Sequence, residues 1–461
     1  MDLFSKKMIV SESEHGKLRR CLSSFDLILF GIGAIIGAGI FVLTGIAAAT
    51  HAGPAVVLSY VLAGIACSFA ALSYAELASS IGGSGSAYNY AYASFGELIA
   101  WIIGWDLILE YAAGACTVAI GWSGYMNNAL SVLGLHIPDA FQKGPLEGGI
   151  LNVSAMSIVA LLTLILILGV KQSARFNAVI VSIKLAVIVI FIAVAATEVN
   201  FKYWHPFMPF GWSGVVSGAA LVFFAYIGFD AVSTAAEEAK DPQRGLSIGI
   251  IGSLFVCTLI YIVVSGLLTA IADYSTLNVK SPVAQTLLNL GHTFSGGLVS
   301  FGAIAGLTSV ILLFIYGLSR VFFAMSRDGL LFEFFSEINP ITQTPVRILV
   351  FGGSIIALAA GLTPIGLMAE MVNIGTLSAF IIVCAGVIVL RKTHPELIRP
   401  FKIPFSPYIP FFGILSCGYL MISLPLATWL RFIVWMTIGL VIYFSYGYYH
   451  SKLRGAGLTK R

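Results

Sequence analysis

The chain has 461 residues, of which 58% are hydrophobic and only 10% are charged, and its formal net charge is +4. A water-soluble protein would have roughly a quarter of its residues charged. This composition excludes a soluble globular protein and indicates a chain whose solvent is lipid.

Apolar runs long enough to cross a membrane recur from one end of the chain to the other. A helix needs about 20 such residues to cross a hydrocarbon core that is ~30 Å thick. The connections are short and polar, so the sequence predicts an all-α, polytopic membrane protein with about twelve transmembrane helices and no soluble domain. The expected spans lie at 24–48, 54–79, 97–130, 151–170, 174–197, 211–236, 246–272, 296–326, 346–362, 366–390, 407–425 and 428–449.

Lysine and arginine are distributed unevenly between the two ends of these spans. If the first span runs from inside to outside, only four of the 25 basic residues fall on the outer side, and Lys184 falls within a span. Cytoplasmic loops retain basic residues, so we expect a plasma-membrane protein with both tails, 1–23 and 450–461, in the cytoplasm. This sidedness accounts for the positive charge without a nucleic-acid partner. The four outer residues are Lys143, Lys202, Lys280 and Arg431.

The first span contains five glycines in the segment GIGAIIGAGIFVLTG, residues 31–45. Glycine permits both close helix packing and unusual backbone angles. One interpretation is therefore a tight contact between helices through Gly33 and Gly37. The other is that the helix unwinds near Gly37, Ala38 and Gly39, which exposes amide N–H groups and the positive end of a half-helix to a carboxylate.

Ionisable residues occur at membrane depth in the third and fifth spans. Lys184 lies in the middle of the fifth span, where a charged side chain costs about 2.5–3.5 kcal/mol. A lysine desolvated in this way can take up and release a proton at a usable pH, or it can serve only to anchor neighbouring carbonyl groups. Asp106 and Glu110 lie four residues apart on one face of the third span. We expect Asp106 to be solvated, and Glu110 to be either a structural ion pair or a counter-charge and proton relay for Lys184.

The sixth span carries Gly228 and Asp230 in the segment FFAYIGFDAVST. An unpaired aspartate at membrane depth is costly, and irregular backbone survives there only where it lines a cavity or is buried in protein. A broken helix would relieve that cost, and its freed carbonyl groups would suit an ammonium group. We expect those carbonyls near Phe223, Phe224, Ala225 and Ile227.

The eighth span offers hydroxyl groups and bulky apolar side chains. Thr308 and Ser309 could be ligands for sodium, although small hydroxyl residues are common in membrane helices. Phe314 and Ile315 could form the wall of a side-chain pocket that admits alanine, serine or threonine more readily than arginine.

The first and sixth spans occupy matching places in two five-span halves, 24–197 and 211–391. Because five is odd, the second half begins on the opposite side of the membrane and is inverted relative to the first. Such inverted repeats place a substrate near the midplane between them. Two additional helices, 407–449, complete the predicted fold.

Four segments carry a family resemblance: the glycine-rich stretch at 31–45, YAEL at 74–77, the stretch at 226–244 and SRDG at 326–329. They resemble the amino acid, polyamine and organocation (APC) superfamily, and in particular bacterial relatives of its cationic amino acid transporter branch. The resemblance implies the leucine-transporter-type fold, with broken helices in the first and sixth spans. In that branch a lysine in this part of the fifth span fills the place where sodium-coupled relatives bind a cation, and its ammonium bridges carbonyl groups of the broken first helix. The resemblance therefore favours proton coupling through Lys184. The resemblance also implies a substrate site on backbone groups. The substrate carboxylate would bind around Ile36, Gly37, Ala38 and Gly39, and the substrate amine would bind carbonyl groups around Phe224, Ala225 and Ile227.

We therefore predict a secondary active transporter that moves small neutral amino acids with protons by alternating access, without a metal or cofactor. Cationic amino acids or polyamines, and sodium coupling, are the alternatives. A membrane-embedded enzyme is disfavoured because all seven histidines fall in tails, loops or span ends, and a channel because no repeated filter-like segment occurs. The sequence leaves open which amino acid is carried, symport or exchange, the oligomeric state and any small accessory membrane subunit.

Overall fold

The computed structural model describes residues 22–81, 86–132, 134–169, 174–234, 239–342 and 344–452. The expected tails, 1–23 and 450–461, lie almost wholly outside these residues.

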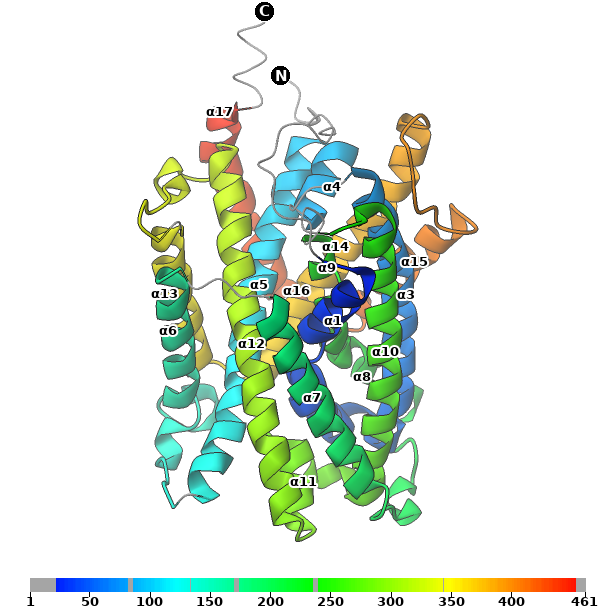
Figure 1. Ribbon diagram of the computed structural model, residues 1–461, viewed down its shortest axis with the longest axis vertical. Coiled ribbons are helices and arrows are strands. Elements are labelled where there is room, and N and C mark those ends of the chain that lie inside the picture. The colour runs from blue at the N-terminus through cyan, green and yellow to red at the C-terminus, as the bar shows by residue number, and fades with distance from the viewer. Residues whose placement is uncertain are drawn as a thin grey trace, which may run out of the picture.

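Long helices that run roughly along one axis form the body of the protein (Figure 1). Among the described residues, 8 helical stretches are long and apolar enough to cross a membrane, and shorter apolar helices accompany them. The described part contains no strand, only an isolated bridge between Leu22 and Ala239. The predicted all-α, polytopic membrane fold is confirmed. The unbroken helices are α3 (Val56–Ile81), α5 (Glu97–Val132), α6 (Val153–Ile167), α7 (Ala174–Ala195), α10 (Pro242–Ile271), α12 (Thr293–Arg327), α13 (Val346–Leu362), α14 (Ile365–Thr393), α15 (Tyr408–Ile422) and α16 (Leu426–Ile442).

Proline marks the start of many of these helices. Its missing N–H is not needed at the first turn, and its ring cannot follow a preceding helical turn. α10 begins with Pro242, next to the N-cap Asp241. Proline precedes the first residue of α13, α14, α15 and α16, at Pro345, Pro364, Pro407 and Pro425.

Short helices lie at the two ends of the bundle (Figure 1). α4 (Ser86–Ser94) and α17 (Tyr448–His450) lie at one end, and α11 (Pro282–Asn289) lies at the other. The search for membrane-crossing runs does not separate these three helices, because they are too short to cross the bilayer.

The first crossing is interrupted where its glycines cluster. α1 (Ser24–Ile35) ends at Ile36, whose backbone is extended with φ −72° and ψ 101°. The chain resumes as a wider π-helical turn, η1 (Gly39–Leu43), and continues through α2 (Thr44–Ala47). The predicted interruption of the first span is confirmed.

The sixth crossing is interrupted in a similar way. α8 (Gly211–Val222) tightens into the 3₁₀ turn η7 (Phe223–Tyr226) and then breaks, before the short helix α9 (Ala231–Thr234). Gly228, within the break, has φ +114°, a conformation that side-chain-bearing residues rarely adopt. The predicted break in the sixth span is therefore confirmed as well.

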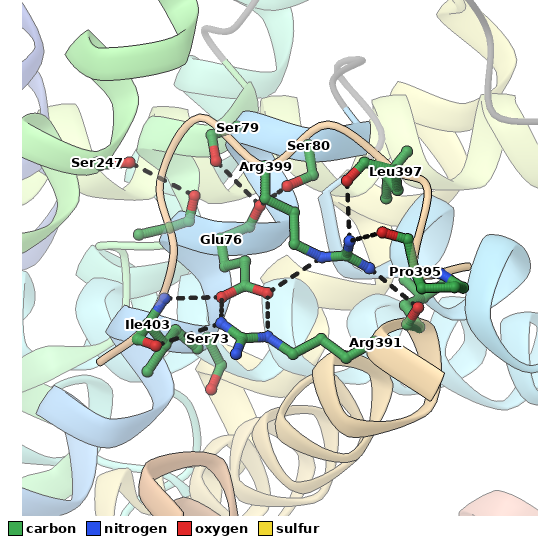
Figure 2. Close-up of polar contacts among 12 residues, drawn as sticks. Ser73, Glu76, Ser79, Ser80, Ser247, Arg391, Pro395, Leu397, Arg399 and Ile403 are labelled. Carbon is green, nitrogen blue, oxygen red and sulfur yellow. Dashed lines mark hydrogen bonds and ion pairs between the residues drawn. The ribbon is translucent and has the colours of Figure 1, made fainter. Parts of the chain in front are cut away.

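A buried carboxylate ties the segment between α14 and α15 to α3 (Figure 2). Glu76 accepts hydrogen bonds from Nε and Nη2 of Arg391 at 2.8 and 2.5 Å, and from the Ile403 N–H at 2.8 Å. Arg399 Nε lies 3.5 Å from the same carboxylate. These contacts hold residues 394–407, which we call the strap, in a defined position.

Glu76→Ala is expected to lower the free energy of unfolding by about 3 kcal/mol, because it leaves a buried arginine without its counter-charge. That arginine is Arg399, whose side chain is only 8% exposed. Glu76→Gln should cost less, since the amide oxygen still accepts hydrogen bonds. Thermal unfolding in detergent measures the effect, with Glu396→Ala in the strap as control because the Glu396 side chain is 71% exposed. Equal melting temperatures for Glu76→Ala and Glu396→Ala would contradict this prediction.

Candidate functional site

The two interrupted helices meet at glycine. A Cβ atom added to Gly39 would lie 2.3 Å from the Cα of Ala225, so the backbones of η1 and η7 touch. A Cβ at Gly228 would lie 2.8 Å from the carbonyl oxygen of Ala34. Real Cβ atoms do not come this close to backbone, so both positions require glycine.

Some glycines of the first span serve close helix packing, and others lie where the helix is interrupted. Gly31 packs against Ser253, and Gly45 against the Leu277 carbonyl, with Cβ distances of 2.4 and 2.5 Å. These two serve close packing. At Gly37 the nearest atom to an added Cβ is 3.4 Å away, an ordinary contact, so packing does not explain this glycine. It lies instead at the interruption itself.

The predicted carboxylate-binding residues all lie at this interruption. Ile36 is the C-cap of α1, and Ala38 is the N-cap of the half-helix that begins at Gly39. The first N–H groups of a helix have no partner within it and mark the positive end of its dipole. Ile36 and Ala38 are fully buried, which strengthens such interactions by excluding water.

The predicted ammonium-binding residues lie in and directly after η7, opposite that half-helix. Phe223, Phe224, Ala225 and Ile227 are all buried. In this conformation the Phe224 carbonyl accepts from the Ile227 N–H at 3.2 Å, and the Ala225 carbonyl accepts from the Tyr261 hydroxyl at 2.7 Å. At least two of the four predicted carbonyls therefore already have a donor.

Lys184 caps the end of α1. Its side chain is fully buried, and its ammonium donates to the carbonyl oxygens of Gly33 at 2.7 Å and Ile36 at 2.9 Å. Carbonyls at a helix C-terminus lack partners within the helix and attract a cation. Gly306 on α12 leaves room for the lysine, because a Cβ there would lie 2.9 Å from two of its methylene carbons.

Glu110 has different neighbours from those the sequence suggested. It is buried and interacts electrostatically with Asp230 and Asp106. Lys184 instead faces α1 and α12, because α7 packs against those helices while α5 packs against α12 and α14. The expected pairing of Glu110 with Lys184 is therefore not present in this conformation.

The environment of Asp106, the other acidic residue of the third span, also differs from the predicted one. We expected it to be solvated, but it is buried. One of its carboxylate oxygens accepts from the Ser378 hydroxyl at 2.5 Å. The tight approach of Gly375, where a Cβ would lie 2.7 Å from this carboxylate, explains the burial.

The match to known proteins extends over nearly the whole described structure. Residues 22–448 match the amino acid permease family. The chain belongs to this family. The permease is 48% identical to the methylthioribose transporter and 49% identical to a branched-chain amino acid permease, both of Bacillus subtilis (strain 168), over 98% of its length and 99% of theirs.

A more distant match agrees with the resemblance seen in the sequence. The permease is 37% identical over 85% of its length to the vacuolar cationic amino acid transporter 4 of Arabidopsis thaliana, of which 66% is covered. The assignment to the APC superfamily is thereby confirmed, and the protein is a transporter and not an enzyme.

One face of α12 lines the interruption in the permease. Gly306 contacts Lys184, Val310 contacts Gly37, and Phe314 packs against Gly114 on α5. These α12 residues are four apart, so they share a face. Both predicted pocket residues, Phe314 and Ile315, are buried. Phe314 lies one turn beyond Val310 on this face.

The hydroxyl groups that we considered as sodium ligands bond within the protein. The Thr308 hydroxyl accepts from the Trp122 indole N–H at 2.9 Å and donates to the Ile304 carbonyl. The Ser309 hydroxyl donates to the Gly306 carbonyl at 2.8 Å.

Three polar residues of the permease that sequence analysis missed hold the broken backbones. Tyr261 lies within hydrogen-bond distance of the carbonyls of Ile35 and Ala225, and Tyr60 donates to the Gly39 carbonyl at 3.2 Å. Asn373 donates to the carbonyls of Ala220 and Leu221, near the end of α8. The signal available in the sequence was a tyrosine or asparagine in the middle of an apolar span.

Proposed function

We propose that this permease is a secondary active transporter that binds an α-amino acid between its two broken helices. The observation that carries the proposal is the contact between Gly39 and Ala225, at which the two interrupted segments η1 and η7 lie against each other. Amides at the positive end of a helix attract a carboxylate, and carbonyl oxygens attract an ammonium. Backbone groups recognise the part that all α-amino acids share, so the surrounding side chains decide among them.

The proposal assigns proton coupling to Lys184. The protonated ammonium donates to Gly33 and Ile36 and balances the negative end of α1. Loss of the proton removes the charge and one donor, so the hold on α1 weakens. Because α1 ends at the substrate site, the protonation state biases the conformation of that site. Transport would then respond to a proton gradient and not to sodium.

The substrate that we propose has a neutral side chain of small or medium size. Val310 and Phe314 give α12 an apolar face next to the interruption. A relative with 49% of its residues identical is named a branched-chain amino acid permease, and branched-chain amino acids have uncharged side chains.

A cationic amino acid is the second candidate, and the acidic residues favour it. Asp106 and Asp230 are buried within electrostatic reach of the buried Glu110, and Lys184 faces other helices. A buried cation is stable only beside a counter-charge, and these carboxylates could supply one. The Arabidopsis relative is named a cationic amino acid transporter.

Competition for uptake into proteoliposomes, under an imposed pH gradient and with or without sodium, separates these candidates. We expect alanine, serine, threonine and branched-chain amino acids to compete at least about tenfold better than arginine or lysine, a difference of about 1.4 kcal/mol. Preferential competition by arginine would overturn the neutral assignment and make Glu110 a side-chain receptor. Competition by methylthioribose alone would overturn the α-amino acid site itself.

A further inference from the structure

A groove runs along the outer surface of the bundle between α3 and α10. Its apolar part is a cavity of about 270 Å³ lined by residues of both helices, including Ser68, Phe255 and Thr258. The Ser68 and Thr258 hydroxyls donate to carbonyls of their own helices at 2.7 and 2.8 Å. Both hydroxyl donors are therefore used within the protein, so an apolar occupant such as an alkyl chain leaves neither of them unpaired.

A second cavity of about 420 Å³ continues the groove toward the start of α10. Ile251 lines both cavities, so they adjoin. Gln243 and Arg244 line this end from α10, and Pro400 and Phe401 line it from the strap. The Glu76 network holds the strap in place (Figure 2), so this wall is positioned before anything binds.

The two ends of the groove differ in charge. Arg244 is exposed at one end, and within the described part of the chain its guanidinium forms no ion pair. Lys240 lies four residues before Arg244 in the sequence, and Lys402 directly follows Phe401. Both lysines are also exposed. The nearby carboxylate of Asp241 caps α10 by accepting from the Arg244 N–H. At this end the three exposed basic side chains outnumber the described carboxylates, Asp241 and Asp26, of which Asp26 interacts with Lys240, whereas the rest of the groove is apolar.

The groove has the dimensions of one leaflet. Ten residues of α10 separate Arg244 from Leu254, which corresponds to about 15 Å at 1.5 Å per residue. Half of a ~30 Å hydrocarbon core has the same depth. The rim residues Phe255 and Ile65 are 64% and 48% exposed, as expected of side chains that face lipid.

We infer that this groove binds an anionic phospholipid of the cytoplasmic leaflet. The phosphate lies at Arg244, between the start of α10 and the strap, and an acyl chain lies between α3 and α10. Basic pockets between membrane helices recognise anionic head groups in this way. The occupant would contact α10, the helix that carries Tyr261 and packs against α1.

Native mass spectrometry of the intact purified protein tests the site with phosphatidylglycerol and phosphatidylcholine as probes. We expect preferential retention of phosphatidylglycerol, reduced about fivefold by Arg244→Gln, which removes one basic charge. Ser68→Trp, which fills the apolar part from an exposed position, should reduce it similarly. The matched controls are Arg320→Gln and Leu161→Trp, which are exposed and line neither cavity.

Other outcomes would overturn the inference. Equal retention of the two lipids would remove the anionic head-group site, and retention unaffected by Ser68→Trp would remove the acyl groove. Glycerol phosphate that competes as well as the lipid would indicate a site for a free phosphate. A lipid-free dimer that Ser68→Trp dissociates would assign the groove to a second copy of the chain. None of these readouts depends on which substrate the protein transports.

Discussion

Gly39→Val is expected to weaken substrate binding by on the order of 100-fold, because overpacking at this contact costs about 3 kcal/mol. A Cβ at Gly39 would lie 2.3 Å from both Cα and Cβ of Ala225. Neither atom is the flexible end of a side chain, so η1 and η7 must move apart. The amides and carbonyls that we assign to the two ends of the amino acid would then be separated too far for one ligand. Scintillation proximity or calorimetric binding to purified protein measures the loss.

A matched pair of glycines separates loss of the site from loss of packing. Gly39→Ala and Gly45→Ala both introduce a methyl group into a tight contact, but Gly45 lies against Leu277 and Pro282, away from the interruption. Both variants should lower thermal stability, and only Gly39→Ala should lower affinity. Normal affinity in folded Gly39→Val would contradict the proposed site, and equal losses of affinity in the matched pair would leave packing as the explanation.

Lys184→Ala is expected to abolish proton-driven accumulation while some substrate binding remains. The ligand is proposed to bind backbone groups, whereas Lys184 holds the end of α1 through Gly33 and Ile36. Lys184→Arg should fail as well, because a guanidinium does not lose its proton at any workable pH, and because the contact with Gly306 leaves little room for a larger group. Uptake into proteoliposomes with an imposed inward proton gradient measures the effect.

Lys202→Ala is the matched control for this prediction, since Lys202 is exposed in a short turn. It should accumulate substrate as the parent does. Intact proton-driven accumulation in Lys184→Ala or Lys184→Arg would refute the coupling role. A sodium requirement in the parent protein would favour Thr308 and Ser309 as sodium ligands.

The spans and their interruptions could be predicted because they depend on local properties of the chain. An apolar run of sufficient length must cross the bilayer as a helix. The glycines at 37 and 39, and Gly228 with its positive φ, report their backbone requirements through residue type alone. The placement of Lys184 near α1 could be expected only from the resemblance, since nothing in the fifth span identifies its partner.

The partners of the acidic residues could not be predicted, because they depend on how each helix is rotated about its axis. Glu110 and Asp106 share a face of α5, but the sequence does not say which helix that face meets. It meets α14, where Ser378 binds Asp106. For the same reason the sequence did not indicate that Val310, one turn before Phe314 on α12, contacts Gly37.

The position of Tyr261 has a consequence for the relative motion of the two half-helices. Its oxygen lies 3.1 Å from the Ile35 carbonyl and 2.7 Å from the Ala225 carbonyl, yet a phenol has a single hydrogen to donate. At any moment the hydroxyl hydrogen can therefore serve only one of the two carbonyls. The phenol joins the end of α1 to η7 through this shared hydrogen, so any motion that parts the two half-helices must break at least one of its contacts.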